Sequence, residues 1–448
     1  MESFGKATSL DAILRAFTIE ALDEKTLPLF YYDNTIAIRT GDEWDSPLED
    51  LFTLCTTPMD TNAHLLIGHR GCGKSTEMNN LKQKFEDAGH PTWIVASMVE
   101  TELGQVNHWD IMLLVTVGLC NIAANKGITL PAETITAIFD YLKKDTEETK
   151  TIEDSDSAQL KVGAEAKTPA LLSGVIKLFA GITTEMKASQ TTRRIVREKM
   201  ERRASEWINS IKEISNWITD GCDGKQPILI FEDLDKLPRS EKSFEIFSYS
   251  VLAQMPFPII YTFPISQFYS SEFGTIRDFY RHHILPMIKV SNLDGSPNSD
   301  GIAVMKKIVE LRAELDLFDG GGSEDSVLEL LIKKTGGSLR DLFKCVVSAA
   351  NRATRRGVAR IELEDVERAL SDLSYELTAQ ISQPDYPMLA DIYCNPRFRE
   401  QIPDRDFLLK MMQKLVVLEY RNGTRWHDLQ PLIAEFLIEQ GVIDESKR

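Results

Sequence analysis

The segment at residues 68–75 reads Gly-His-Arg-Gly-Cys-Gly-Lys-Ser and constrains the fold more than any other part of the chain. An apolar run at residues 64–67 precedes it, and a helical pattern over residues 74–88 follows. Glycines at these spacings let the backbone turn tightly, so that its N–H groups point at the oxygens of a phosphate. Strand, glycine-rich turn and helix in this order match the phosphate-binding pattern GxxxxGK[ST] in full. We therefore expect an α/β fold in which this loop closes one end of a parallel sheet.

The polar residues of this loop have separate expected tasks. Lys74 would place a positive charge near the β- and γ-phosphates of a nucleotide, and Ser75 would offer its hydroxyl to Mg²⁺. The helix that begins here adds the positive end of its dipole. The nucleotide-binding residues expected from the motif are Gly68, His69, Arg70, Gly71, Cys72, Gly73, Lys74, Ser75 and Thr76. The alternative is a glycine-rich turn between a strand and a helix that holds no ligand.

A second polar group follows another buried strand. The apolar residues 228–231 lead directly into Glu232, Asp233 and, two positions later, Asp235. Open α/β sheets bind ligands beyond the carboxyl ends of their strands, so these acids are expected near the phosphate-binding loop. One carboxylate can hold Mg²⁺ through water while its neighbour polarises the attacking water. An acidic turn without function is the alternative.

Short apolar runs and helical patterns alternate along most of the chain. The five runs expected to form strands are residues 64–67, 93–96, 228–231, 259–261 and 287–290. Such strands, separated by helices, predict a five-stranded parallel sheet covered on both faces. The domain limits that we expect are an N-terminal helical or linker segment (1–60), the sheet domain (61–295, with an insertion at about 145–205), a helical domain (296–380) and a small C-terminal unit (385–448). One long helix is expected over residues 192–219.

Composition and charge restrict the environment and the partners. The formal net charge is −17, so the bulk field of the protein disfavours binding to nucleic acid or to an anionic membrane. The uncharged stretch at residues 246–271 is interrupted by three prolines, and we expect no membrane-spanning segment and no secretory signal. None of the six cysteines has CxxC or zinc-ligand spacing, which predicts free thiols in a reducing, cytoplasmic setting.

The segments GHRGCGKST and ILIFEDLDKL together resemble the Walker A and Walker B motifs of AAA+ P-loop ATPases. The LDKL ending is most similar to the origin-recognition-like and KAP-type ATPases, and the resemblance spans roughly residues 30–375. By position it implies that Glu232 supports the metal and that Asp233 activates the water, with Asp235 and Lys236 in support. The family usually has Asp before Glu, so the reversed order puts the rate of hydrolysis in question more than binding.

The resemblance also implies residues that respond to the γ-phosphate. Thr262 follows the run at 259–261 and is the expected sensor, the alternative being a threonine that caps a strand. Arg340, within TGGSLRDL, would reach the γ-phosphate from the start of a helix in the lid, which is the helical domain. Arg281, ahead of the fifth expected strand, is the first choice for an arginine finger acting on a neighbouring subunit. Arg277 is the second choice, and ordinary surface salt bridges are the alternative for both.

Two further regions bear on partners. Six basic residues between Arg193 and Arg203 could follow a phosphate backbone, although such a run is more often a solvated helix face with i,i+4 ion pairs. The C-terminal unit contains the strong hairpin turn Asn422-Gly423 and resembles a winged-helix domain. It has nine basic and eleven acidic residues, whereas a duplex-binding wing is usually basic. Contact with a protein is therefore at least as well supported as contact with DNA.

These observations together predict an ATP- and Mg²⁺-dependent AAA+ switch or motor that couples nucleotide state to assembly or partner binding. A homo-oligomer and a protein effector are the expected partners, nucleic acid is weakly supported, and a membrane is not expected. ATP is favoured over GTP because the chain has no NKxD motif for reading guanine. The alternatives are a slow or non-hydrolysing signalling module, for example in bacterial defence, and an ATP-dependent nucleic-acid loader.

Overall fold

A five-stranded parallel sheet lies at the centre of the computed structural model, which describes residues 5–33, 35–57, 61–95, 106–131, 133–134, 189–237 and 241–444. Its strands, in spatial order, are β2 (Thr92–Val95), β3 (Ile228–Phe231), β4 (Ile259–Pro264), β1 (Ala63–Gly68) and β5 (Arg281–Ile284). Every neighbouring pair is parallel. Since only β4 separates β1 from β3, the segments that follow these two strands meet at one edge of the sheet.

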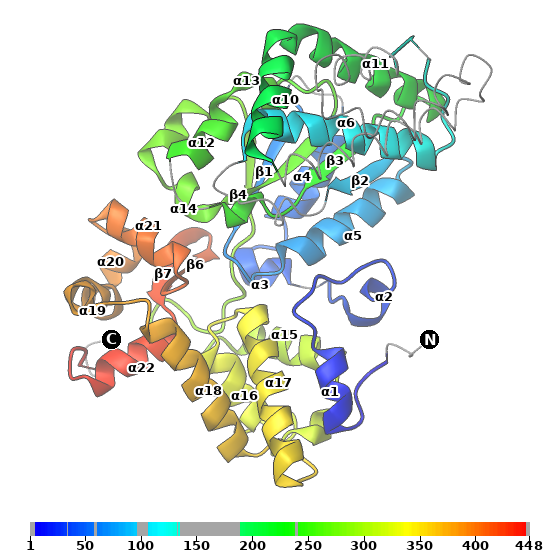
Figure 1. Ribbon diagram of the computed structural model, residues 1–448. Helices are drawn as coiled ribbons and strands as arrows, with labels where there is room; N and C mark the ends of the chain where they lie inside the picture. The colour runs from blue at the N-terminus through cyan, green and yellow to red at the C-terminus, as the bar shows by residue number, and fades with distance from the viewer. Residues whose placement is uncertain are drawn as a thin grey trace.

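Helices cover both faces of the sheet, as the buried apolar runs predict (Figure 1). Side chains alternate along each strand, so Leu65 packs with α6 on one face while Leu66 packs with α4 and α5 on the other. The helices of the sheet domain are α4 (Pro47–Thr56), α5 (Lys74–Asp87), α6 (His108–Asn125), α10 (Gln190–Arg202), α11 (Ala204–Gly221), α12 (Glu241–Ser248), α13 (Ser250–Ala253) and α14 (Ile265–Phe268). Two 3₁₀ turns, η3 (Leu234–Lys236) and η4 (Ser271–Thr275), complete the described part of this domain.

Two expected elements differ from the structure. The fifth strand is not the apolar run at 287–290 but the polar segment at 281–284, which pairs with β1. The run at 287–290 is buried all the same, and the amide of Asn298, just before the helical domain, donates to Val290 O, 3.0 Å away. Burial alone does not distinguish a strand from a buried connection.

The second difference concerns the long helix expected over residues 192–219. It divides at Arg203 into α10 and α11, although its predicted apolar positions Trp207, Ile211, Ile214 and Ile218 are all buried. Most of the expected insertion at 145–205 lies outside the described residues.

Four helices form the lid, residues 299–378. They are α15 (Ser299–Glu310), α16 (Val327–Lys334), α17 (Leu339–Arg356) and α18 (Leu363–Thr378), with the 3₁₀ turn η5 (Leu315–Leu317) between the first two. The N-terminal segment adds α1 (Leu10–Ala16), α2 (Leu27–Phe30) and α3 (Ile36–Thr40). Helix α1 packs on α17, and the rings of Phe17 and Phe343 meet edge to face with centroids 5.3 Å apart. Helix α1 and Phe17 of the N-terminal segment therefore pack against the lid.

The C-terminal unit has the expected order of helices, strand, turn, strand and helix. Its elements are η6 (Gln383–Asp385), α19 (Tyr386–Cys394), α20 (Pro396–Glu400), α21 (Arg405–Gln413), β6 (Val417–Asn422), β7 (Thr424–Leu429) and α22 (Pro431–Glu439). We call the antiparallel pair β6–β7, residues 417–429, the wing hairpin. Its turn places Gly423 at a positive φ of 72°, which is why glycine suits this position.

The architecture confirms the expected fold class: an α/β parallel sheet flanked by helices, then a helical lid and a winged-helix-like unit. All six cysteines are free, as their spacing predicts. Across the described ranges, none of the helices combines the length and apolar character needed to cross a bilayer. The domain limits given above remain predictions.

Candidate nucleotide-binding site

The loop between β1 and α5 has the backbone shape that its glycines predict. Gly71 and Gly73 have positive φ angles of 84° and 103°, and α5 begins at Lys74. A Cβ atom on Gly71 would lie 3.0 Å from Cβ of Arg340 and 3.1 Å from Oγ of Ser338. Glycine is thus required here both by conformation and by the close approach of the lid. We call residues 68–75 the phosphate loop.

Lys74 lies inside this loop with its ammonium group fully partnered. Its Nζ donates to the carbonyl oxygens of Gly68 and His69, at 2.8 and 2.9 Å, and forms an ion pair with Asp235 Oδ2 at 2.9 Å. Burial by itself would lower the pKa of Lys74, but the charge and hydrogen bond of Asp235 together with the charge of Cys72 outweigh it, and the pKa is raised. The loop therefore encloses a charged ammonium group.

Three acids follow β3, and each has a different environment. Glu232 Oε1 is buried, and no described group lies within hydrogen-bond distance of it. Burial, together with the charges of Asp233 and Asp235, raises the pKa of Glu232 to about 7. Asp233 adopts a left-handed backbone with φ of 68° and pairs with Lys236 at 2.5 Å. The direct partner of Lys74 is Asp235, which the sequence analysis placed only in a supporting role.

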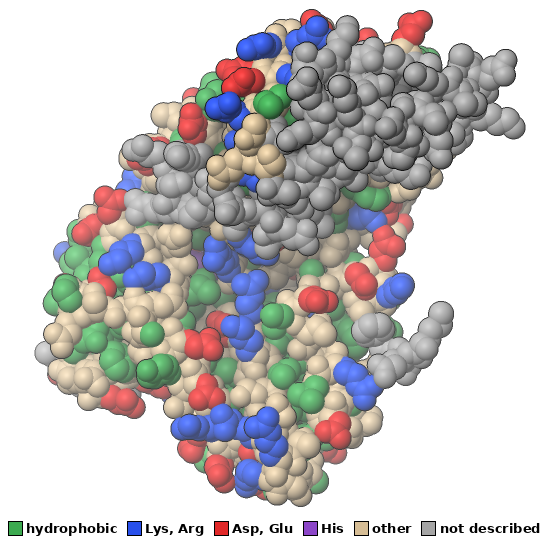
Figure 2. Space-filling model, in the orientation of Figure 1, with side chains coloured by type: hydrophobic (Ala, Val, Ile, Leu, Met, Phe, Trp, Pro, Cys, Tyr) green, Lys and Arg blue, Asp and Glu red, His purple; other side chains and the backbone are tan. Residues whose placement is uncertain are grey.

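A cleft of about 640 Å³ joins the loop, the acids and the lid. This volume lies in the range of small-molecule sites. Basic side chains gather along the centre of the face drawn in Figure 2, between the sheet domain and the lid. From the predicted set, the residues that line the cleft are Arg70, Gly71, Gly73, Lys74, Ser75, Thr76, Glu232, Asp233 and Arg340.

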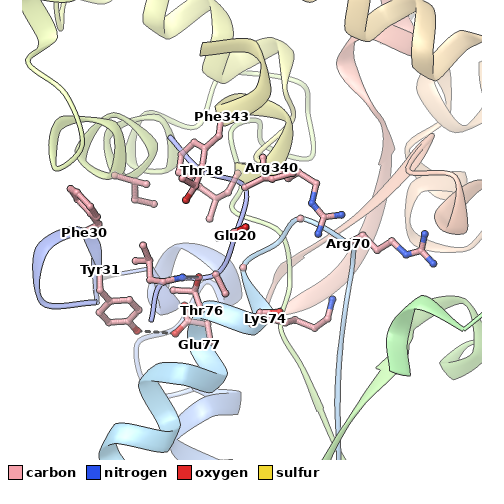
Figure 3. Close-up of a pocket in the computed structure, with 18 of the residues that line it drawn as sticks. Thr18, Glu20, Phe30, Tyr31, Arg70, Lys74, Thr76, Glu77, Arg340 and Phe343 are labelled. Atoms are coloured by element: carbon pink, nitrogen blue, oxygen red, sulfur yellow. Dashed lines mark hydrogen bonds between the residues drawn. The ribbon is translucent and has the colours of Figure 1, made fainter. Parts of the chain in front are cut away.

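Arg340 enters the cleft from the lid. It is the second residue of α17, whose first turn is capped by Ser338 Oγ accepting from the amide of Asp341. Figure 3 shows the side chains of Arg340 and Lys74 extending toward the same side of the cleft. Arg70 lies beside them and donates from Nη2 to Lys236 O at 3.1 Å, linking the phosphate loop to the acidic turn. The structure thus brings together three motifs that are far apart in the sequence.

The N-terminal segment supplies the remaining wall, which sequence reasoning missed. Tyr31 donates from its hydroxyl to Glu77 Oε2 at 2.8 Å, and Thr76 Oγ1 accepts from the amide of Leu22 at 3.3 Å. The guanidinium of the buried Arg39 donates to Cys72 O in the phosphate loop at 2.8 Å. Nothing in the sequence around these residues forms a recognisable motif, and only packing reveals their position.

Arg312 connects this wall to the lid. Its guanidinium lies over the rings of Phe30 and Phe343, with centroids 5.4 and 4.8 Å from Cζ, and donates to Phe30 O at 3.1 Å. Both rings line the cleft. Movement of the lid would therefore change the contacts that Arg312 makes with the N-terminal segment.

Two predicted loop side chains and the predicted sensor are turned away from the cleft. His69 and Cys72 are buried outside its lining. Thr262 is also buried: its Oγ1 accepts from the amides of Leu234 and Asp235, at 2.9 and 3.3 Å, and donates to Phe231 O. Through these hydrogen bonds Thr262 holds the backbone that carries the acids, and its role as a sensor stays a prediction.

Arg281 lies at the opposite edge of the sheet from the phosphate loop. It is the first residue of β5 and stands in register with His64 near the start of β1. Its Nε is buried, and no acceptor lies within reach in the part of the chain that the structure describes. It cannot act on the cleft of its own chain, and a role at a neighbouring subunit stays a prediction. Arg277 is exposed and pairs with Asp278 at 3.3 Å, as in an ordinary surface salt bridge.

The basic run at 193–203 forms most of α10 and the turn after it. Arg197 pairs with the carboxylate of Asp110 on α6, and Arg193 is buried. Arg194 pairs with Glu198 in the i,i+4 relation, at 3.7 Å. The pair Arg194–Glu198 fits the expected solvated face with i,i+4 ion pairs, whereas Arg193 and Arg197 pack toward the rest of the sheet domain.

Comparisons with solved structures give matches that cover most of the chain at low identity. The Orc2 protein of Aeropyrum pernix, in its ADPNP–ADP complexes, is 12% identical with a TM-score of 0.41, covering 94% of this chain and 98% of that one. Cdc6p of Pyrobaculum aerophilum is 12% identical with a TM-score of 0.33, covering 97% and 98%. RuvB of Thermotoga maritima is 11% identical with a TM-score of 0.36, covering 94% and 99%.

No protein-family model matches the sequence, and no curated protein is significantly similar to it. With scores and identities this low, the activity of this chain has to be inferred from its own residues.

Proposed function

We propose that this chain is an AAA+ ATPase that binds ATP with Mg²⁺ and couples its nucleotide state to assembly or to the binding of a protein partner. One observation carries the proposal. The charged ammonium of Lys74 lies within the phosphate loop, against acids that follow β3, in a cleft that the lid residue Arg340 also lines. Loop amides, an ammonium group, acids and an arginine are the groups that phosphoryl transfer requires.

The residues of the cleft fit a metal-bound triphosphate. Ser75 lines the cleft beside Glu232, whose unpartnered Oε1 is a buried acceptor of the kind that Mg²⁺ uses. A bound Mg²⁺ would neutralise charge that develops on the phosphate oxygens. Lys74 would exchange its carbonyl and Asp235 contacts for phosphate oxygens, and Arg340 would contact the γ-phosphate. Asp233 would orient the attacking water.

A slow, signalling form of this activity is the second candidate. Asp233, the expected water-activating acid, is held by Lys236 and is one methylene shorter than the usual glutamate. A short carboxylate engaged in an ion pair is a weak general base. This observation favours a switch that holds ATP for long periods over a fast motor.

The proposed partners follow from the same residues. Arg281 on the far edge of the sheet is suited to act at the site of a second copy, so we infer a homo-oligomer, in the cytoplasm, with a protein effector. Binding of nucleic acid is less well supported, because Arg194 and Arg197 on α10 are ion-paired and the net charge is acidic.

Substitution of Lys74 by alanine tests the proposal. Removing the ammonium eliminates charge-assisted hydrogen bonds to the phosphates, and ATP affinity should fall by roughly a hundredfold or more. Titration with a fluorescent ATP analogue in the presence of Mg²⁺ measures it. Lys84→Ala, in the last turn of the same helix and paired with Glu49, is the matched control and should bind normally. Binding by Lys74→Ala as tight as by the parent would overturn the proposal.

Single-turnover hydrolysis separates the two candidates. A rate well above that of buffer, lost in Glu232→Gln, would support the fast ATPase. A rate equal to that of buffer, with ATP binding intact, would support the slow signalling form.

A further inference from the structure

The wing hairpin contacts the phosphate loop directly. The backbone N–H of Glu419 on β6 donates to Nε2 of His69, at 2.9 Å, in a buried contact. The carbonyl of the same His69 accepts from the ammonium of Lys74 at 2.9 Å. One residue is therefore bonded at its side chain to the C-terminal unit and at its backbone to the cation of the nucleotide site.

The next residue of the hairpin contacts the base of the lid. The hydroxyl of Tyr420 donates to the carbonyl of Gly336 at 2.8 Å. Gly336 has a positive φ of 61°, and a Cβ atom there would lie 2.9 Å from Pro431 and 3.0 Å from Leu418 of the C-terminal unit. It stands four residues before Arg340, so the hairpin is bonded to the segment from which Arg340 enters the cleft.

The tip of the hairpin contacts the third wall. The amide of Gly423 donates to the carbonyl of Thr40 at 3.1 Å, and Arg421 pairs with Asp45 at 2.5 Å. Thr40 follows Arg39, whose guanidinium holds Cys72 O in the phosphate loop. The wing hairpin thus touches the phosphate loop, the lid and the N-terminal segment, which are the three parts that surround the cleft.

Further packing holds the C-terminal unit against the sheet domain. Trp426 is buried and stacks on Tyr420, with ring centroids 4.7 Å apart, within an apolar cluster that includes residues of α4 and α5. Helix α21, which precedes the hairpin, packs on α14 of the sheet domain. Figure 1 shows α21 lying next to α14 of the sheet domain. In this arrangement the inner face of each element is buried, while the hairpin turn and the outer face of α21 stay exposed.

We propose that docking of the wing hairpin and occupancy of the phosphate loop are coupled through His69, so that a bound triphosphate releases the hairpin. This proposal rests on the ATP binding proposed above and adds its regulation. In the docked arrangement the Lys74 ammonium is held by Gly68 O, His69 O and Asp235. A triphosphate draws the ammonium away from these partners and so favours the undocked state. By reciprocity, loosening the hairpin tightens binding of the triphosphate.

Hydrogen exchange on the full-length chain tests this coupling. The reporter is the backbone amide of Glu419, together with the rest of β6, measured with and without a slowly hydrolysed ATP analogue and Mg²⁺. In the parent, the analogue should accelerate exchange of β6 by roughly tenfold, the equivalent of about one hydrogen bond. In His69→Phe, which keeps a ring but removes the acceptor, exchange should be fast already and the analogue should add nothing.

Matched variants keep the test decisive. His90→Phe also replaces a buried histidine, one that contacts Gln226 O instead of the hairpin, and it should behave as the parent. Tyr420→Phe retains the packed ring while removing the bond to Gly336, so exchange should rise roughly threefold and the analogue should bind more tightly. Should His69→Phe fail to fold, unchanged exchange and unchanged affinity in Tyr420→Phe would overturn the coupling.

The affinity of the parent for the analogue, measured on the same samples, distinguishes the two possible failures. If the parent binds the analogue at saturation and β6 stays protected, the coupling is wrong while ATP binding stands. If the parent does not bind the analogue, the proposed function fails and the coupling fails with it.

Discussion

The two ends of strand β1 have opposite polar chemistry. At its carboxyl end, Gly68 leads into the phosphate loop and a cleft where Glu232 Oε1 is buried without a described partner. At its amino end, His64 lies against His283 of β5, with Nδ1 and Nε2 3.2 Å apart, and Arg281 stands in register beside them. One strand therefore connects a site open to a ligand with a closed cluster of nitrogen groups.

The difference shows what makes one edge of a sheet suitable for binding. The loops that leave the carboxyl ends of parallel strands diverge and leave space, which the lid and the N-terminal segment close only in part. At the amino end, the side chains of His64 and His283 are buried, while Arg281 stays partly exposed. Burial is the main cause that lowers the pKa of His64 to about 3 and that of His283 to about 4. Neighbouring histidines and Arg281 lower both pKa values further. The histidines are thus neutral structural groups.

Arg281→Ala tests whether the amino end of the sheet has only a structural role. If Arg281 acts on the site of a neighbouring copy, its loss should lower the hydrolysis rate by roughly a thousandfold, because an arginine finger stabilises transition-state charge. ATP affinity of the separated chain should not change. ATPase activity measured against protein concentration checks this. Arg360→Ala, an exposed arginine of the lid, is the control.

Mixing two variants tests whether Arg281 acts on the site of another chain. An equimolar mixture of Arg281→Ala and Lys74→Ala chains should regain activity, since each chain supplies the residue that the other lacks. Hydrolysis by Arg281→Ala at the parental rate, at every protein concentration, would leave the amino edge purely structural.

Acid should destabilise the amino edge. The folded-state pKa values of His64 and His283 lie below the unfolded value of about 6.5, so the unfolded chain takes up protons first as pH falls. The stability that these residues contribute is complete above pH 6.5 and is lost toward the folded pKa values. The free energy of unfolding should fall by up to about 1.4 kcal/mol per pH unit for each histidine.

Urea unfolding at pH 7, 6 and 5 measures this slope. His64→Phe removes one of the two groups and should flatten the dependence of the free energy of unfolding on pH. An identical slope in His64→Phe and the parent would contradict the assignment.

Thr262→Val tests the role of Thr262 at the carboxyl end of the sheet. Its expected effect is the smallest of those predicted here. The substitution leaves the amides of Leu234 and Asp235 without their acceptor, which should cost about 1–3 kcal/mol in the free energy of unfolding. Thr262→Ser keeps the hydroxyl and should restore most of it. If Thr262→Val instead loses hydrolysis while stability and ATP affinity stay parental, Thr262 is the γ-phosphate sensor of the original prediction.

Much of the local structure was predictable because it depends on neighbouring residues. The glycines at 71 and 73 permit positive φ angles, the apolar residues 228–231 favour burial, and Asn422-Gly423 favours a tight hairpin turn. Each of these is a property of a few consecutive side chains and their backbone. The fifth strand was misplaced because the apolar run at 287–290 satisfies burial without pairing, whereas the polar residues 281–284 pair with β1.

The sequence by itself determined that a phosphate loop, a strand ending in acids and a C-terminal hairpin exist, because backbone conformation and burial depend on a few consecutive residues. Only the tertiary structure decided which acid meets Lys74 and that Glu419 meets His69, 350 positions away. Such contacts depend on how whole helices and strands pack against one another. The motifs mark Lys74, His69 and Asp235 locally, but nothing local states which of these side chains contact one another.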